Sequence, residues 1–435
     1  MQALLSYEQA PPLAAPLRFF LSAPVFGLLV GLLLLWGGPD TLASRWTPVT
    51  LAVTHLITAG FMLQIMLGAM LQILPVVAGA NMARPMRVAN AVHVSTSVGA
   101  LCLAAAFLSY SPLLFTLAAL LLGAGVALFI AAAGRALWGV TSTSPTISGL
   151  KFSLVGLGVA VGLGVLLSVA LGGSLELPVL QLADIHLAWG FVAWGTIVLA
   201  AVAYVVVPMF QLTPAYPDRF GRAFALATFV AVVLWTLAEL TSMPLLAGIL
   251  AFSVVAAPVL FASVTLLIQR RSKRARFDAT QHYWRVAMAC ALAACAVWLA
   301  GTRVTFFAER TEWPLLCGVL VLFGAFMSVM VGMLYKIVPF LVWLHLQNQG
   351  QGFVMAPNMK KMIAEAAMNR QMIAHIVSVA LLVLAVFWPT WFVYPAGLAV
   401  LLANAGLLYN LLSAVSVYRR HVEKIESAKC LAQNV

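Results

Sequence analysis

The chain has 435 residues, of which 63% are hydrophobic and only 8% are charged, and its mean hydropathy is +1.04. A soluble globular protein is about 25% charged and about 45–50% apolar, so this composition leaves too few polar groups to cover a surface that faces water. The sequence therefore predicts an integral membrane protein and excludes a soluble enzyme with a single membrane anchor.

Continuously apolar segments, bounded by Gly, Pro or charged residues, predict about twelve membrane-spanning helices, since one bilayer span needs about 20 apolar residues. The strands of a membrane barrel would instead alternate in hydrophobicity over about ten residues. We therefore expect an all-α, polytopic membrane fold. The predicted spans are residues 17–36, 48–78, 89–110, 112–139, 147–172, 183–209, 222–240, 244–269, 280–300, 313–344, 371–388 and 391–417.

Basic residues cluster at alternate ends of these predicted helices. Of the 24 Lys and Arg residues, only Arg45, Arg303 and Arg310 fall on the other side. Short cytoplasmic loops accumulate Lys and Arg, so we expect a bacterial-type inner-membrane protein with both termini in the cytoplasm and a short tail over residues 418–435. This alternation explains the net charge of +12, so the expected partner is the lipid bilayer and no nucleic acid.

An internal repeat divides the chain into three parts. The octapeptides GAMLQILP, AVAYVVVP and GMLYKIVP end at Pro75, Pro208 and Pro339, which are 133 and 131 residues apart. Each octapeptide falls at the end of a second span, so we expect three four-helix pseudo-repeats in one membrane domain (1–435), over roughly residues 1–140, 141–275 and 276–420. In an alternative interpretation, these prolines end helices and the small residue seven positions earlier serves only helix packing.

Two of the seven histidines, His55 and His186, are predicted to lie deep in the membrane. They precede Pro75 and Pro208 by 20 and 22 residues, which is about 30 Å of helix at a rise of about 1.5 Å per residue. The other five histidines are expected at or near the cytoplasmic ends. Because a neutral ring nitrogen can bind heme iron or copper, His55 and His186 are candidate cofactor and metal ligands. The alternative is a hydrogen bond to a neighbouring carbonyl.

Cys317 is the third candidate metal ligand. It precedes Pro339 by 22 residues, which is the offset of His186 from its own proline. A buried free cysteine more often only fills space, and this alternative stays open. The two-residue difference between the offsets of His55 and His186 would turn their side chains about 200° apart on straight helices, and a bulge in one helix would remove this conflict.

Three other polar features have structural interpretations. Asp184 is expected to cap the helix that carries His186. Tyr335 lies next to Lys336 and is expected to anchor a helix end at the membrane interface, with a redox or hydrogen-bonding role as the alternative. The amphipathic stretch NMKKMIAEAAMNRQ (358–371) is expected to form an interfacial helix or a connector.

The number of spans, the three units and the two deep histidines together resemble subunit I of the heme-copper oxidase and nitric oxide reductase superfamily, and still more its short relatives, the NnrS-like membrane proteins. The string HLAWGFVAWGTIVLAAVAYVVVPMFQLTPAYP, from His186 to Pro217, is similar to the H-x-x-x-G…G-x-x-Y-x-x-P segment of the cbb3-type subunit. The opening PLRFF, from Pro16 to Phe20, is similar to the Pro/Phe-rich lead-in of NnrS-like chains.

This resemblance implies that His55 is an axial heme ligand and that His186 is a ligand of copper or heme. The oxidases also carry a histidine pair on helix seven and two histidines on helix ten. Here residues 222–240 contain no histidine, and helix ten has only His345 at its cytoplasmic end. We therefore expect no complete oxygen-reducing binuclear site.

The sequence thus favours a heme- or copper-binding inner-membrane protein in electron transfer or in nitric oxide or respiratory metabolism, partnered by an electron donor or a respiratory subunit. Such a protein would be an enzyme only if it is a heme or copper oxidoreductase. Two other functions stay open: a multi-pass transporter or channel for a small solute, and a membrane subunit that serves assembly without catalysis.

Overall fold

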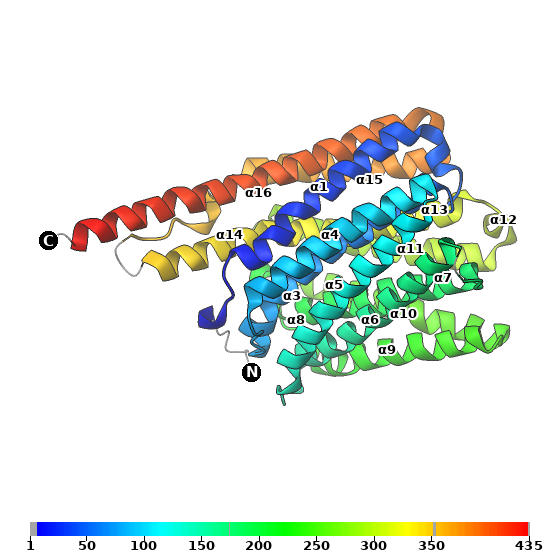
Figure 1. Cartoon of the computed structure of the whole chain (residues 1–435), viewed down its shortest axis with the longest axis horizontal. Coiled ribbons are helices and arrows are strands. Elements are labelled where there is room, and N and C mark those ends of the chain that lie inside the picture. Colours follow the sequence, from blue (N-terminus) through cyan, green and yellow to red (C-terminus); the bar gives the residue numbers. More distant parts are fainter. Residues whose placement is uncertain (1–6, 174, 351–353, 434–435) are drawn as a thin grey trace.

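The computed structural model describes residues 7–173, 175–350 and 354–433, and within these ranges it consists of helices and connecting loops (Figure 1). Twelve helical segments are long and apolar enough to cross a membrane, which confirms the predicted all-α polytopic fold. They are α1 (Ala14–Gly37), α2 to α3 (Pro48–Ala78), α4 (Pro85–Ser109), α5 (Pro112–Trp138), α6 (Pro145–Leu171), α7 to α8 (Val179–Gln211), α9 (Asp218–Leu240), α10 (Pro244–Gln269), α11 (Ala279–Arg303), α13 to α14 (Glu312–Gly350), α15 (Glu365–Phe387) and α16 (Pro389–Gln433).

Local sequence signals explain where several spans begin. Thr47, Ser111 and Ser144 each accept a hydrogen bond from the backbone N–H three residues further on, and a proline follows each of them. A hydroxyl at the N-cap satisfies one of the free N–H groups of the first turn, and proline fits the first helical position because its missing N–H is not needed there. These caps let each span start sharply after a short loop.

The two ends of the helix bundle differ in charge. The 3-10 helix η1 (Tyr7–Gln9) and the last turns of α16 lie at the same end (Figure 1). The half of the bundle that carries this end contains all the Lys and Arg residues except Arg45, Arg303 and Arg310. We call it the basic end. The loop that holds the short helix α12 (Thr305–Ala308) lies at the opposite end.

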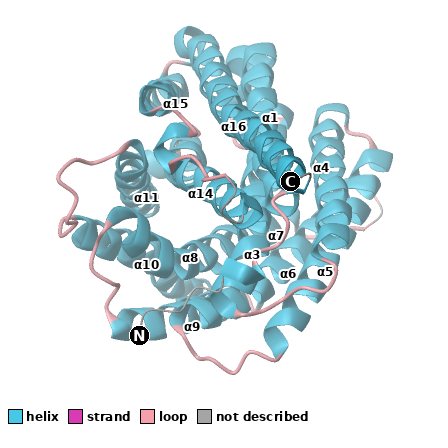
Figure 2. Cartoon of the chain, turned by 90° about the vertical axis from the view of Figure 1, so that its left-hand side faces the viewer, coloured by secondary structure: helices cyan, strands magenta, loops and turns pink. Residues whose placement is uncertain are grey.

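The three four-helix groups that the sequence repeat predicts, named units 1, 2 and 3 here, close into a ring. The last span of unit 1, α5, packs against the first span of unit 2, α6. In the same way α10 of unit 2 packs against α11 of unit 3, and α16 of unit 3 returns to α1 (Figure 2). The last span of each unit thus packs against the first span of the next.

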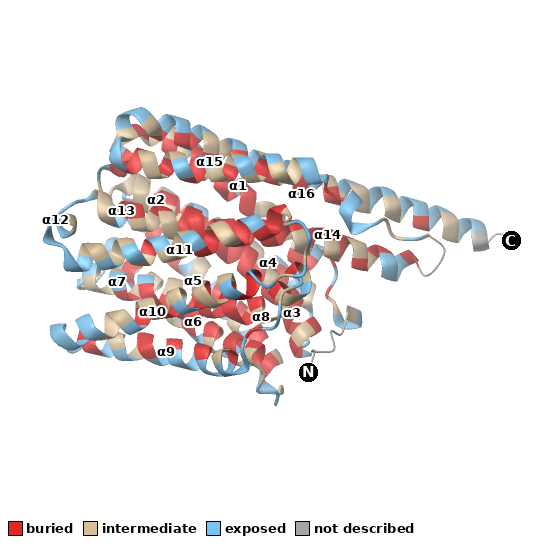
Figure 3. Cartoon of the chain, turned by 180° about the vertical axis from the view of Figure 1, so that it is seen from behind, coloured by how far each residue is buried: buried red, intermediate tan, exposed pale blue. Residues whose placement is uncertain are grey.

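The second span of each unit lies at the centre of this ring. In the most apolar 18-residue stretch of each span, the share of buried residues is 89% for the second span of unit 1, 67% for that of unit 2 and 78% for that of unit 3. In the other nine spans this share is at most 50%. Figure 3 shows the buried residues gathered around α3, α8 and α14. The nine outer spans therefore separate the three inner spans from lipid.

The small residue of the octapeptide brings each inner span close to the first span of its unit. A Cβ added at Gly68 would lie 2.9 Å from the Cβ of Phe19 in α1, and one added at Gly332 would lie 2.6 Å from the Cβ of Tyr283 in α11. In unit 2, Ala201 approaches α6 in the same way. The small residue therefore permits close packing, as small residues do at helix interfaces in membranes.

Candidate cofactor site

A cavity of about 920 Å³ lies between the inner spans, in the half of the bundle away from the basic end. All three inner spans contribute to its wall, for example through Met62, Trp194 and Phe323, and most lining side chains are aliphatic or aromatic. Binding sites for small molecules and cofactors are typically apolar cavities of about 300–1,000 Å³ with a few polar groups. The cavity has the size and lining of such a site.

Each inner span contains one segment of π-helix beside this cavity. The segments are η3 (Leu56–Met62), η4 (Trp189–Thr196) and η5 (Leu320–Met327), and each begins 19 residues before the proline of its octapeptide. Segments of π-helix are rare in proteins, but those that occur are frequently found at functional sites. A bulge in one helix alone would have removed the two-residue difference between the offsets of His55 and His186 from their prolines. Because all three inner spans contain the bulge at the same register, this difference remains.

His55 is the last residue of α2 (Pro48–His55) and lines the cavity. Its Nδ1 lies 2.8 Å from the carbonyl oxygen of Leu51, and its ring packs on Phe107 with 4.9 Å between the ring centroids. A carbonyl oxygen only accepts hydrogen bonds, so Nδ1 carries the proton. The lone pair of the neutral ring is therefore on Nε2.

His186, in α7 (Val179–Ala188), lines the same cavity and has the same arrangement. Its Nδ1 lies 2.8 Å from the carbonyl oxygen of Ala160 in α6. Gly164 leaves room for the ring, because a Cβ at this position would lie only 3.2 Å from Cε1 of His186. A neighbouring helix thus fixes both the tautomer and the orientation of this imidazole.

These two histidines can act as ligands. Histidines that bind metals usually donate their other ring N–H to a carbonyl or carboxylate, which fixes the tautomer and makes the ligating nitrogen more basic. Within the described part of the chain, no hydrogen bond involves Nε2 of His55 or His186. The hydrogen bond to a carbonyl, which the sequence offered as an alternative to ligation, is present and is compatible with it.

Cys317 also lines the cavity. It precedes η5 by three residues, as His186 precedes η4, and its Sγ lies 3.8 Å from the carbonyl oxygen of Ala294. The described residues contain no group of three or more His, Cys, Asp and Glu side chains that could hold one metal ion. A role of Cys317 as a metal ligand therefore stays a prediction.

An ion pair lies at the outer rim of the cavity. Arg45 Nη2 is 3.3 Å from Asp184 Oδ1, and both residues line the cavity although they are far apart in the sequence. The expectation that Asp184 caps its helix is wrong, because α7 begins five residues earlier, at Val179, with Pro178 at the cap position. Both side chains are about half exposed, at 38% and 54%, so this pair contributes little to stability.

His375 is a buried histidine that sequence reasoning missed. It is only 2% exposed, its Nε2 lies 2.8 Å from the hydroxyl oxygen of Ser328, and its ring packs on Tyr283. The sequence placed it near a helix end because the eleventh span was expected to start at residue 371. The span starts at Glu365, so His375 lies almost three turns inside the bundle. Of the two alternatives for residues 358–371, the structure has the connector: the short helix η6 (Met359–Lys361) and a short loop lead directly into α15.

A hydrogen-bonded polar cluster continues from His375 toward the basic end of unit 3. The Tyr335 hydroxyl donates to Gln371 Oε1 at 3.0 Å and accepts from Asn410 Nδ2 at 2.9 Å, and Tyr283 donates to the same Gln371 oxygen at 2.6 Å. Tyr335 is 3% exposed, so the expectation that it anchors at the interface is wrong. Its hydroxyl is satisfied inside the protein instead of by head groups.

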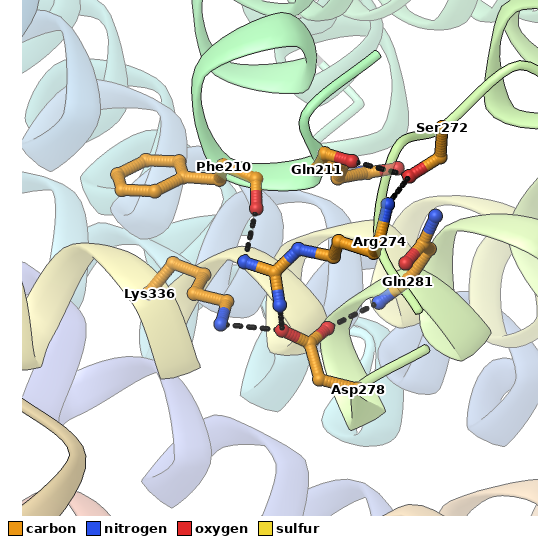
Figure 4. A network of polar contacts seen from close by, with 7 residues as sticks. All are labelled: Phe210, Gln211, Ser272, Arg274, Asp278, Gln281 and Lys336. Atoms are coloured by element: carbon orange, nitrogen blue, oxygen red, sulfur yellow. Dashed lines mark hydrogen bonds and ion pairs between the residues drawn. The ribbon is translucent and has the colours of Figure 1, made fainter. Parts of the chain in front are cut away.

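A second polar network joins units 2 and 3 at the basic end (Figure 4). Asp278 caps α11 and accepts from Lys336 at 2.6 Å and from Arg274 at 2.9 Å. Arg274 also donates to the carbonyl oxygen of Phe210 in α8 (Ile197–Gln211), at 2.7 Å. Burial alone would raise the pKa of Asp278, but the hydrogen bond and charge of Lys336, with the backbone N–H of Gln281 and the charge of Arg274, lower this pKa overall.

Comparison with known proteins adds no family to this description. No model of a known protein family matches the chain, and no characterised protein sequence matches it significantly.

Proposed function

We propose that this multi-pass membrane protein binds a heme in the cavity between its inner spans, where Nε2 of His55 and of His186 would hold the iron. The observation that carries the proposal is the pair of imidazoles in one large apolar cavity, each with Nδ1 held by a carbonyl oxygen at 2.8 Å. A heme needs only one or two protein ligands, so the two histidines suffice.

The chain's own residues would supply ligation, orientation and an environment of low dielectric constant, while a bound heme would supply the redox chemistry. The carbonyl oxygens of Leu51 and Ala160 hold the proton of each imidazole on Nδ1, and most of the wall around the rings is aromatic or aliphatic. This supports a role in electron transfer or in the handling of a small diatomic molecule such as nitric oxide. We further propose that the basic end faces the cytoplasm of a bacterial-type cell, following the distribution of Lys and Arg. An electron donor or a respiratory subunit would then be the partner.

Copper belongs to the same proposal as a second metal. Imidazole suits copper, and a thiolate such as that of Cys317 suits Cu(I). His186 and Cys317 occupy equivalent positions three residues before η4 and η5, and both line the cavity. Metal analysis of the purified protein separates heme iron from copper.

The direct test is a visible spectrum with metal analysis of protein purified from membranes of cells supplied with heme precursor and copper. We expect a Soret band with stoichiometric iron in the wild type, and its loss or shift in His55→Ala, His186→Ala or the double variant. His93→Ala is the matched control, because His93 bonds to Ser22 and does not line the cavity. A folded wild type with neither a Soret band nor copper would overturn the proposal. An unchanged cofactor in the double variant would refute the ligand assignment alone.

The same cavity also supports a second function, a transporter for a small solute. It lies between the predicted repeat units, as substrate sites do in transporters built from internal repeats, and the ion pair of Arg45 and Asp184 lies at its rim. Flux of a solute into proteoliposomes that contain cofactor-free protein would favour transport over electron transfer.

A further inference from the structure

A groove of about 790 Å³ lies at the basic end, far from the cavity described above. One wall is the loop with Pro357 and Lys361, and the other is the part of α16 that extends beyond the bundle (Figure 1). The lining residues of α16 recur at intervals of three and four from Val417 to Leu431, so they lie on a single helix face about 21 Å long at about 1.5 Å per residue.

Positive charge dominates the groove. Lys361 on one wall and Arg420 and Lys424 on the other are all exposed, and the only acidic residue in the lining is Glu423. Arg420 and Lys424 are four residues apart, hence on the same side of the helix. His421 donates from Nδ1 to the carbonyl oxygen of Val417 at 3.0 Å, which leaves its Nε2 as a polar atom of the lining.

The groove begins where α16 leaves the apolar layer. The apolar sequence of this helix ends at Tyr418, and Arg419 and Arg420 follow directly. Tyrosine followed by basic residues is typical of the level of the lipid head groups. A phosphate group at the membrane surface therefore lies at the height of Arg420.

The walls of the groove are fixed by packing on the rest of the protein. Ile425 is 4% exposed and reaches Gly350 at the end of α14, while Gln349 donates to the Tyr418 hydroxyl at 3.0 Å. Met362, next to Lys361 in the loop, is 2% exposed. Because these contacts already hold the loop and the helix, a ligand would not have to order them on binding.

We propose that this groove binds the head group of an anionic phospholipid, with its phosphate held by Lys361 and Arg420 and with Lys424 further along the groove. Two basic side chains from different segments that converge on one concavity match a lipid phosphate, which each of them can contact through a charge-assisted hydrogen bond. The position of the groove at the membrane interface favours a lipid over a soluble phosphate compound. The proposal is independent of any cofactor.

Native mass spectrometry tests it with full-length protein released from nanodiscs of phosphatidylcholine that contain increasing phosphatidylglycerol. We expect the wild type to retain phosphatidylglycerol, and the triple variant Lys361→Gln/Arg420→Gln/Lys424→Gln to bind it roughly 100-fold more weakly, because each basic residue near a membrane surface contributes substantially to anionic lipid binding. Arg420→Lys should keep most of the affinity.

The matched control removes three exposed basic residues of the same end outside the groove, as Arg87→Gln/Arg135→Gln/Arg271→Gln. This variant should bind phosphatidylglycerol like the wild type. An equal loss in both triple variants would overturn the proposal, because it would assign the binding to overall surface charge. Release of the lipid by millimolar inorganic phosphate, or no retention of phosphatidylglycerol by a folded wild type, would overturn it too.

Discussion

Lys336 Nζ lies 2.6 Å from Asp278 Oδ2, and this contact closes the polar network at the junction of units 2 and 3 (Figure 4). Arg274 reaches the same carboxylate oxygen at 2.9 Å and connects it to the end of α8 through the carbonyl oxygen of Phe210. One carboxylate therefore holds the end of α8, the loop after α10 and the middle of α14 together.

Asp278→Asn should destabilise this junction without removing the helix cap, since asparagine also caps helices well. Loss of hydrogen bonds between charged partners should lower the free energy of unfolding by about 2 kcal/mol. The measurement is the thermal unfolding midpoint in detergent, with Asp218→Asn as the control because Asp218 is exposed at the start of α9. An equal decrease in both variants would argue against a special role of the network.

The lowered pKa of Asp278 also predicts a dependence of stability on pH. A carboxyl whose pKa is lower in the folded than in the unfolded protein stabilises the fold above its unfolded pKa of about 3.9 and loses this contribution as the pH falls through the folded pKa. The difference in unfolding midpoint between the wild type and Asp278→Asn should thus be constant near neutral pH and shrink below about pH 3.9. A difference that stays constant down to the acid limit of the fold would contradict this.

Tyr335 and Tyr204 occupy the same repeat position, four residues before their prolines, but should respond differently to loss of the hydroxyl. Tyr335→Phe removes a group bonded to Gln371 and Asn410 and should cost about 1–2 kcal/mol. The Tyr204 hydroxyl is buried with no hydrogen-bond partner among the described residues, so Tyr204→Phe should be neutral or slightly stabilising. Unfolding midpoints of the two variants check this, and the reverse order would refute it.

Gly164→Ala should disturb His186 although it does not change the histidine itself. The new Cβ would lie 3.2 Å from Cε1, so the ring must move by a few tenths of an ångström. Under the proposed function, cofactor occupancy should fall or the Soret band should shift. Gly162→Ala is the matched control, because a Cβ there meets nothing within 4 Å and the helix propensity changes equally. Identical spectra and cofactor contents in the two variants would show that Gly164 does not position His186 for the cofactor.

Hydropathy was sufficient to predict the spans, because each needs only a long apolar run and a polar or Pro-containing boundary. The offsets from Pro75 and Pro208 also predicted that His55 and His186 lie at similar depth, and both histidines line one cavity. Hydropathy could not supply the exact helix starts, and two predicted starts were wrong by several residues. Such errors moved His375 from an interface to the interior and turned Asp184 from a cap into a partner of Arg45.

Other features have no local sequence signal at all. The pairing of Arg45 with Asp184 joins different units and depends on how the ring closes. The π-helical segments η3, η4 and η5 depend on which carbonyl each N–H reaches after the inner spans have packed. Composition and periodicity do not encode that choice.

The return of α16 to α1 also determines when the molecule can be completed during synthesis. The two helices approach closely at Gly31 and Gly397, where a Cβ at Gly31 would lie 2.9 Å from the Gly397 carbonyl oxygen. During synthesis α1 thus meets α16 only after the ten spans between them have been made. The central cavity therefore cannot be enclosed before α16 has been made and has packed on the glycine surface of α1.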